Sequence, residues 1–395
     1  MFRAAKALAP SGLKRLCHSF RYRYCWLRWL PGTSRQFGPP RHWVRLADYL
    51  RAHPGSSHEV LPAHRLPEPV IRYCNAVPPR FVSRIQREIP AAHVLELPEV
   101  RLLGDEGWIV GARDSLILDT SYHAFPDREM RPDDHWILRR TRARPLQRLR
   151  GRTLSLASDF ARGGFAHFVH DSLSRLLLLE RAGIDPTSFD QIYWPHPPGV
   201  GTKQLLAASR IPLHKLIPPD PGTDFECESL TATTFPGRPA HLTPPYCDFL
   251  RHRFAPPPRG AGRRVYLSRA GFARNFVNAP AIEDVLRAHG YEVCEPHRDP
   301  HALARCAAAS HLVSLEGSGF YNAFAAPPGT RSLVILPEGG QTLPYNLLVA
   351  LSAGHHLHLL LARSVPTPNP DPSVSAVMLD PAELARALDV MDRIR

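Results

Sequence analysis

Two histidines, an aspartate and an arginine follow one another at the spacing of a single helix face. The segment from Phe165 to Gly183 is rich in leucine, and its final glycine predicts a helix that stops there. Polar residues at i, i+3, i+4, i+7 and i+8 of that helix share a face; they are His167, His170, Asp171, Ser174 and Arg175. Imidazoles beside a carboxylate suit proton transfer or the binding of a polar ligand. The alternative is an ordinary exposed helix face.

A glycine turn in residues 311–330 is the second candidate for chemistry. The run Leu312 to Leu315 predicts a buried strand, Gly317-Ser318-Gly319 a turn, and Phe320 to Ala326 a helix. Free backbone N–H groups at a helix start, with the positive end of the dipole behind them, form a site for a phosphate or diphosphate. Glycines that only permit a tight turn between strand and helix are the alternative.

Several other kinds of site lack their sequence patterns. The chain has no H-E-x-x-H, no closely paired cysteines and no Asp-x-Asp, so we expect no metal site. His355, His356 and His358 alternate along a predicted strand and are expected to pack or face solvent. The glycine turn fits neither the G-x-S-x-G of a hydrolase nor the G-x-G-x-x-G of a dinucleotide site, where Asn322 takes the third place.

The charge is strongly positive but unevenly distributed. Only four of the 49 basic residues are lysine, and basic residues concentrate in residues 1–54 and 131–152. Such segments suit anionic lipid, a polyanionic glycan or nucleic acid, although a solvated basic surface explains them equally well. No nucleic-acid-binding module accompanies the charge, so we expect no specific nucleic-acid partner. We also expect no signal peptide or membrane span, and the seven scattered cysteines indicate a reducing compartment.

The predicted elements divide the chain into four parts. Residues 1–40 form a basic, aromatic arm suited to peripheral membrane contact, or a loosely packed arm without that role. Residues 41–255 are predicted to be one α/β domain, with strands at 94–97, 108–110, 115–118, 191–194, 215–217 and 225–235. After a proline linker, residues 263–365 form a second α/β domain. Residues 366–395 hold a proline-rich crossing and a C-terminal helix.

Ligands of such sheets bind beyond the carboxyl ends of the strands. Arg269 and Arg274 follow the first strand of the second domain, and the glycine turn follows a later one. We therefore expect these residues to converge on one diphosphate, with acceptor chemistry on the first domain and a cleft between the two.

The motifs in their order resemble glycosyltransferase family 61, which contains bacterial capsular-polysaccharide biosynthesis proteins and plant xylosyl- and arabinosyltransferases. The resemblance covers roughly residues 90–365. The matching residues are Phe165-Ala166-His167-Phe168 with Asp171 and Arg175, Phe189 to Pro195, Ser268-Arg269 with Arg274 and Asn278, and Glu316-Gly317-Ser318-Gly319-Phe320 with Asn322 and Pro328-Gly329. In the last motif Glu316 stands where the family has histidine.

The resemblance implies a GT-B-like fold, in which two Rossmann-like domains with parallel sheets face a cleft and the C-terminal helix packs back across the linker. It also implies an inverting glycosyltransferase of bacterial capsular or other surface-polysaccharide synthesis. The enzyme would move a hexose or pentose from a nucleotide sugar, expected to be uridine-diphosphate-linked, to a glycan acceptor. It would need no metal and no cofactor, and would work in the cytoplasm or at the membrane surface.

The expected site has two parts. His167 or Asp171 would be the general base, and Arg269, Arg274 and the backbone of Gly317, Ser318 and Gly319 would hold the diphosphate. Glu316 and Asn322 complete the expected donor site, with Glu316 accepting hydrogen bonds from ribose or sugar hydroxyls. Two other functions fit the sequence: an inactive relative that binds glycan or nucleotide, and a basic polyanion-binding protein.

Overall fold

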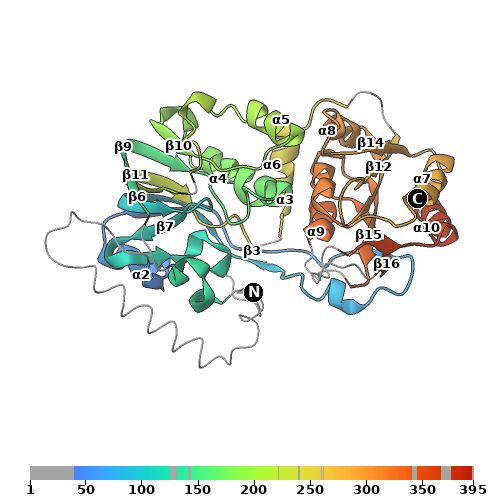
Figure 1. Ribbon diagram of the computed structural model, residues 1–395, viewed down its shortest axis with the longest axis horizontal. Helices are drawn as coiled ribbons and strands as arrows, with labels where there is room; N and C mark the ends of the chain where they lie inside the picture. The colour runs from blue at the N-terminus through green and yellow to red at the C-terminus, as the bar shows by residue number, and fades with distance from the viewer. Residues whose placement is uncertain are drawn as a thin grey trace.

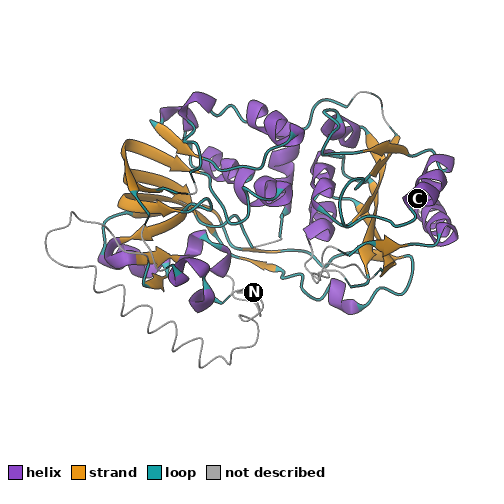
Figure 2. Ribbon diagram, viewed as in Figure 1, coloured by secondary structure: helices purple, strands orange, loops and turns teal. Residues whose placement is uncertain are grey.

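The computed structural model describes residues 40–124, 131–140, 144–220, 222–238, 241–258, 260, 262–339, 345–365 and 375–393. The predicted basic arm lies outside these residues except for Pro40, and so does most of the predicted proline-rich crossing. Among the described residues, no helix is both long and apolar enough to cross a membrane. Two main sheets organise this part of the chain, with helices on both sides of the second sheet (Figures 1 and 2).

The first sheet has eight strands among the described residues and is mixed. Seven strands lie in the order β1 (His42–Val44), β8 (Ser115–Ile117), β7 (Trp108–Gly111), β6 (Ala92–Leu103), β11 (Asp224–Thr233), β9 (Leu146–Ser155) and β10 (Gln191–Tyr193). The eighth, β2 (Ser56–Leu61), pairs antiparallel with β6. Strands β9, β10 and β11 pair in parallel, whereas β6, β7 and β8 run antiparallel.

The prediction of a parallel sheet is therefore wrong for the β6–β8 part. The reason is the turn between β6 and β7, where Gly104 and Gly107 have φ of 72° and 64° and the Gly107 amide donates to the Gly104 carbonyl. Such a short turn reverses the chain, whereas a parallel pair needs a long crossover connection.

The second sheet is parallel except at one edge. Its order is β13 (Glu292–Cys294), β12 (Arg263–Leu267), β14 (Ala309–Leu315), β15 (Arg331–Pro337), β16 (His356–Ser364) and β17 (Val377–Met378), and only β17 runs antiparallel in that path. Strand β4 (Ile71–Tyr73), from early in the chain, also pairs in parallel with β16. Residues from the predicted first domain thus complete the second sheet.

A layer of helices lies between the two sheets (Figure 1). From the first half come α3 (Phe165–His167), η9 (Phe168–Leu173), α4 (Arg175–Arg181), α5 (Val200–Ala208) and α6 (Pro244–Phe254). From the second half come α8 (Ala302–Ala307), the 3₁₀ helix η12 (Ser318–Ala325) and α9 (Tyr345–Ser352). Their buried apolar side chains form one cluster, which includes Leu176, Leu177, Phe254, Phe320, Phe324 and Ala350. The cluster fixes the first-half helices against η12.

Two elements differ from the sequence predictions. Residues 215–217 form no strand: a 3₁₀ helix, η11 (Leu213–Lys215), and one bridge between Ile192 and Leu216 take its place. Pro218 and Pro219 follow directly, and without amide hydrogens they cannot extend a ladder.

The C-terminal helix α10 (Pro381–Arg393) packs on α7 (Ala279–Ala288) on the outer face of the second sheet, and not across the linker (Figure 1). Its apolar stripe, with Leu384 and Leu388, meets Ile282 and Leu286 of α7. Burial of that stripe in the second half explains the position.

Candidate active site

The predicted helix from Phe165 to Gly183 is continuous but contains a π-helical turn. α3 leads into the π-helix η9, and α4 completes the segment. The π turn is marked by the Ser174 amide, which donates to the Val169 carbonyl five residues earlier. Gly183, with φ of 68°, ends the helix as predicted. π turns inside α-helices often occur at functional sites, and this one holds the histidines and the aspartate.

Three side chains meet at the carboxylate of Asp171. Nδ1 of His167 lies 2.9 Å from Oδ2 of Asp171, and the Tyr122 hydroxyl donates to the same oxygen over 2.8 Å. On the other side, Nε2 of His170 lies 2.6 Å from Oδ1 of Asp171. Asp171 and His170 are fully buried, whereas His167 retains 22% side-chain exposure. The alternative of an ordinary exposed helix face is therefore wrong.

The surroundings keep Asp171 ionised although it is buried. Burial by itself raises the pKa of Asp171, but the nearby His170 and the hydrogen bond from His167 outweigh it, so that the pKa lies below its ordinary value. Burial and the nearby Asp171 charge raise the pKa of Tyr122 well above its ordinary value, so its hydroxyl stays a donor. A carboxylate that orients an imidazole in this way is the arrangement that general-base histidines use.

Arg175 lies on the same helix but anchors the helix to the first sheet. Its guanidinium is 2% exposed and donates to the Asp171 carbonyl, Ser158 Oγ, Thr233 Oγ1 and the carbonyls of Thr233 and Thr234. Ser174 Oγ is also used inside the helix, donating to the His170 carbonyl. These two members of the predicted face therefore hold the backbone and do not face the imidazoles.

Replacement of Arg175 by lysine should lower the free energy of unfolding by about 2 kcal/mol, because an ammonium cannot reproduce the planar fork and leaves buried acceptors unpaired. Urea denaturation measures this change. Arg181→Lys, at the exposed end of the same helix, is the control and should leave stability within about 0.5 kcal/mol. A loss as small for Arg175 as for Arg181 would contradict the anchoring role.

The glycine turn lies where β14 ends and η12 begins. Ser318 and Gly319 are the first residues of η12, so their amides have no carbonyl of an earlier turn to bind. Asn322 Nδ2 donates to the Gly319 carbonyl over 2.8 Å, and Asn346 Nδ2 donates to the Gly317 carbonyl over 2.9 Å. Ser318 is exposed. The predicted strand, turn and helix are thus present, with exposed amides at the turn.

Arg269 lies directly over this turn. A Cβ atom built on Gly317 would come within 1.4 Å of Nη1 of Arg269, so the guanidinium occupies the place of a side chain. Nε of Arg269 donates to the Arg274 carbonyl over 2.9 Å, while Nη1 and Nη2 form no hydrogen bond or ion pair with any described residue. Burial, and then Arg274, lower the pKa of Arg269 to about 10, so it stays charged at neutral pH. Unpaired guanidinium nitrogens beside helix-start amides suit an anion.

Arg274 and Glu316 form a buried ion pair next to Arg269. Nη1 of Arg274 lies 3.2 Å from Oε2 of Glu316 and also contacts the Glu316 carbonyl. Glu316 is 4% exposed, and burial raises its pKa to about 7 against the opposing effect of Arg274 and Arg269. Glu316 is therefore able to change protonation near neutral pH.

Glu316→Gln should remove one part of the pH dependence of stability. Because the folded-state pKa is raised, Glu316 stabilises the fold below its unfolded value of 4.5, and this contribution is lost as the pH rises through about 7. The unfolding free energy of the wild type relative to Glu316→Gln should therefore fall by on the order of 2 kcal/mol between pH 4.5 and 7.5. Urea denaturation at three pH values in that range measures it. A difference that rises with pH would show that Arg274 lowers the Glu316 pKa.

Two helices of the second half bring the imidazoles and the glycine turn together. Tyr321 of η12 stacks on His170 with centroids 5.7 Å apart, and its hydroxyl lies 3.3 Å from Nδ1 of His170. Tyr345 of α9 packs edge-on against His167 at 5.7 Å. The next residue, Asn346, holds the Gly317 carbonyl. The two predicted parts of the site therefore share one region of the molecule.

Sequence reasoning named the histidines, the aspartate, the arginines and the glycines as candidates, but did not name their neighbours Tyr122, Tyr321, Tyr345 and Asn346. Tyr122 is 45 residues from His167 in the chain, and Tyr321 is 151 residues from His170. Tyr321 lies two residues after Gly319, so its position next to the glycine turn could have marked it as a candidate site residue. The other three belong to no recognisable motif.

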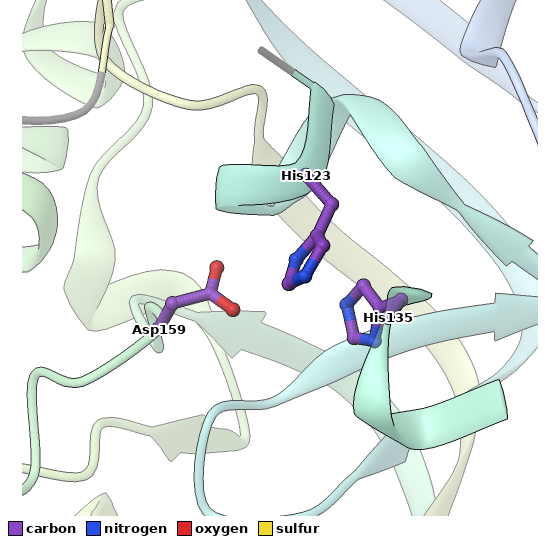
Figure 3. Close-up of side chains that lie close together, drawn as sticks. All are labelled: His123, His135 and Asp159. Carbon is purple, nitrogen blue, oxygen red and sulfur yellow. The ribbon is translucent and has the colours of Figure 1, made fainter. Parts of the chain in front are cut away.

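A third group of buried polar residues lies next to Tyr122, whose backbone amide donates to one of them, Asp159. His123, His135 and Asp159 each direct one possible ligand atom toward the others, all within 4.8 Å (Figure 3). They are the residues of the described chain able to hold a metal ion as a cluster of three. Sequence analysis predicted no metal site from the lack of known metal motifs. The spacings of 12 and 24 residues between these three side chains match no such motif either.

The protein is therefore an α/β protein with a histidine–aspartate pair on one helix. In the same region it has a glycine turn covered by the Arg269 guanidinium. The model of the family Glycosyltransferase 61 matches residues 165–333, which include both parts of the site. This match supports the resemblance to glycosyltransferase family 61 that the motifs indicated. A comparison with curated proteins finds no match.

Proposed function

We propose that this protein is an inverting glycosyltransferase of bacterial capsular or other surface-polysaccharide synthesis. It transfers a hexose or pentose from a uridine-diphosphate sugar to a glycan acceptor, in a GT-B-like arrangement, in the cytoplasm or peripherally at the membrane. The contact of Tyr321 with His170 carries the proposal, because it joins the helix that holds the candidate base, His167, to the 3₁₀ helix that begins at the candidate diphosphate site. The match of residues 165–333 to the glycosyltransferase family 61 model supports it.

His167 is the proposed general base and Asp171 its partner. Sequence analysis left the choice open, but Asp171 is fully buried and His167 is partly exposed, so only His167 can meet an acceptor hydroxyl. If Nδ1–H of His167 donates to Asp171, Nε2 is left to take the acceptor proton as the acceptor oxygen attacks the anomeric carbon.

Arg269 and the amides of Ser318 and Gly319 are the proposed diphosphate site. The two unpaired nitrogens of Arg269 and the helix-start amides would stabilise the negative charge on the leaving diphosphate, the role a divalent metal has in other transferases. Gly317 would allow Arg269 to lie against the turn. Arg274, Glu316 and Asn322 complete the proposed donor site, with Glu316 toward ribose or sugar hydroxyls.

The proposal is tested by a donor-hydrolysis and transfer assay with a panel of nucleotide sugars and no added divalent cation. Release of the nucleoside diphosphate from one donor, with NMR showing the opposite anomer in the product, is the expected result. Retention of the donor configuration would overturn the inverting mechanism. An absolute need for Mg²⁺ or Mn²⁺ would overturn the role given to Arg269.

A non-catalytic nucleotide- or glycan-binding relative is the second candidate, and the Arg274–Glu316 pair favours it. That pair places the Glu316 carboxylate beside the arginines that would meet a diphosphate. The negative charges of the carboxylate and the diphosphate would repel each other. Binding of uridine diphosphate by calorimetry without turnover of any donor in the panel would support this candidate.

A further inference from the structure

His123, His135 and Asp159 come from three separate segments and meet in the protein interior. His123 lies in η6 (Tyr122–Ala124), His135 directly precedes η8 (Trp136–Arg139), and Asp159 lies in the loop after β9. All three are at most 3% exposed. Their side chains point toward one another (Figure 3), and one ligand atom of each lies within 4.8 Å of the others. None of them has a part in the proposed transfer reaction.

Asp159 is a buried carboxylate without a cation. It forms no ion pair with any described residue, and its two oxygens accept only the Trp108 indole N–H at 2.8 Å and the Tyr122 amide at 2.9 Å. A buried charge is costly unless it is paired or binds a metal. Hydrogen bonds of this kind are also those that orient a metal-ligating carboxylate from behind.

The two histidines lie close together beside one serine. Their rings lie 4.2 Å apart. Nδ1 of His135 accepts the Ile137 amide at 3.2 Å, while Nε2 lies 3.2 Å from Ser121 Oγ. Ser121 Oγ is also 3.5 Å from Nδ1 of His123. One hydroxyl therefore lies next to both imidazoles.

We propose that His123, His135 and Asp159 bind a zinc ion, with Ser121 Oγ or a water molecule as the fourth ligand. Two imidazole nitrogens and one carboxylate oxygen are a ligand set typical of zinc, and too poor in oxygen for magnesium or calcium. Zinc-to-ligand distances of about 2.1 Å put ligand atoms roughly 3.4 Å apart, so the side chains must close by about 1 Å.

Zinc binding at Nε2 of His135 moves the ring proton. Nδ1 accepts the Ile137 amide, so the neutral ring carries its proton on Nε2. That proton is displaced to Nδ1 when zinc binds, and the hydrogen bond from the Ile137 amide is lost. The Asp159 carboxylate neutralises one of the two zinc charges.

The site is connected to the proposed active site through Tyr122. The Tyr122 amide donates to Asp159, and the Tyr122 hydroxyl donates to Asp171. Zinc on Asp159 would therefore fix the tyrosine that holds Asp171 and His167, which makes the zinc a positioning element. This role rests on the proposed function, whereas zinc binding itself does not.

The test measures zinc directly in the full chain. Purified protein is dialysed against Zn²⁺ and then against metal-free buffer, and the metal is counted by plasma mass spectrometry. We expect one zinc per chain in the wild type and at least a tenfold loss of zinc in His123→Gln, His135→Gln and Asp159→Asn. His355→Gln removes a buried histidine elsewhere, bonded to Ser332, and should keep its zinc.

A second measurement does not depend on the variants folding. Co²⁺ in place of zinc should give the wild type the absorption bands of a tetrahedral site, and removal of the metal should lower its melting temperature. No zinc in the wild type, or unchanged zinc in all three folded variants, would overturn the proposal and leave a hydrogen-bonded network through Ser121.

The proposed role of zinc in positioning Tyr122 is tested separately, by kinetics and calorimetry after zinc removal. Removal of zinc should lower kcat at least tenfold with the calorimetric affinity for uridine diphosphate unchanged, because Arg269 lies outside the cluster. If zinc binds and its removal leaves kcat unchanged in an active enzyme, the positioning role is wrong and the site is structural. If zinc binds to a protein without transferase activity, the proposed function fails and the zinc site stands.

Discussion

Replacement of Asp171 by asparagine is expected to lower the transferase turnover by about 10²- to 10⁴-fold, the usual contribution of an acid–base group. One carboxylate oxygen of Asp171 lies next to Nδ1 of His167 and accepts a hydrogen bond from the Tyr122 hydroxyl. The other oxygen lies close to His170. The asparagine side chain keeps the shape of the carboxylate but carries no charge. Its NH₂ group would face the groups that now donate to Asp171, so it no longer favours the form of His167 with the proton on Nδ1. Steady-state kinetics with saturating donor measure the effect.

The expected loss falls on kcat and not on donor binding, since the side-chain contacts of Asp171 among the described residues are with Tyr122, His167 and His170 and not with the glycine turn. Asp224→Asn is the matched control: Asp224 is also buried and is paired with Arg140 at 2.7 Å, but lies outside the site. That variant should lose stability and keep its turnover. Full turnover in both Asp171→Asn and His167→Ala would rule out this pair as the base.

Arg269→Ala is expected to weaken the binding of uridine diphosphate at least 100-fold. Two charge-assisted hydrogen bonds at about 1.5 kcal/mol each give roughly 3 kcal/mol, which corresponds to that factor. The unpaired Nη1 and Nη2 atoms over Gly317 are the groups available for those bonds. Isothermal titration calorimetry measures the affinity directly and needs no knowledge of the acceptor.

Arg298→Ala is the control for loss of positive charge near the site. Arg298 belongs to the loop after the neighbouring strand β13, is 68% exposed and pairs with Glu295. Surface charges of this kind contribute little, so its affinity should change less than threefold. Equal losses in both variants would show that Arg269 acts only through the general field of the protein.

Local sequence patterns predicted the elements that carry the site. Leucine spacing and Gly183 predicted the helix, and the apolar run with Gly317 and Gly319 predicted the strand, turn and helix of the second part. These predictions succeeded because periodicity and glycine conformation depend on neighbouring residues in the chain.

Sequence patterns did not predict which distant strands pair with one another. The antiparallel run of β6, β7 and β8 and the addition of β4 to the second sheet depend on strand contacts, which hydrophobic patterns do not encode. The burial of Arg175 is a similar case: its spacing suggested a ligand contact, but its acceptors are Ser158, Thr233 and Thr234, outside the helix.

The sequence by itself indicated the family resemblance and the candidate residues: a histidine and an aspartate four positions apart, arginines after a strand and a glycine turn. Only the tertiary structure decided what those residues contact. Tyr122 reaches Asp171 from a distant segment, and Tyr321 and Tyr345 pack against the imidazoles. Covalent neighbours set spacing along a helix, whereas burial and hydrogen bonding between distant segments arise only when the core is packed.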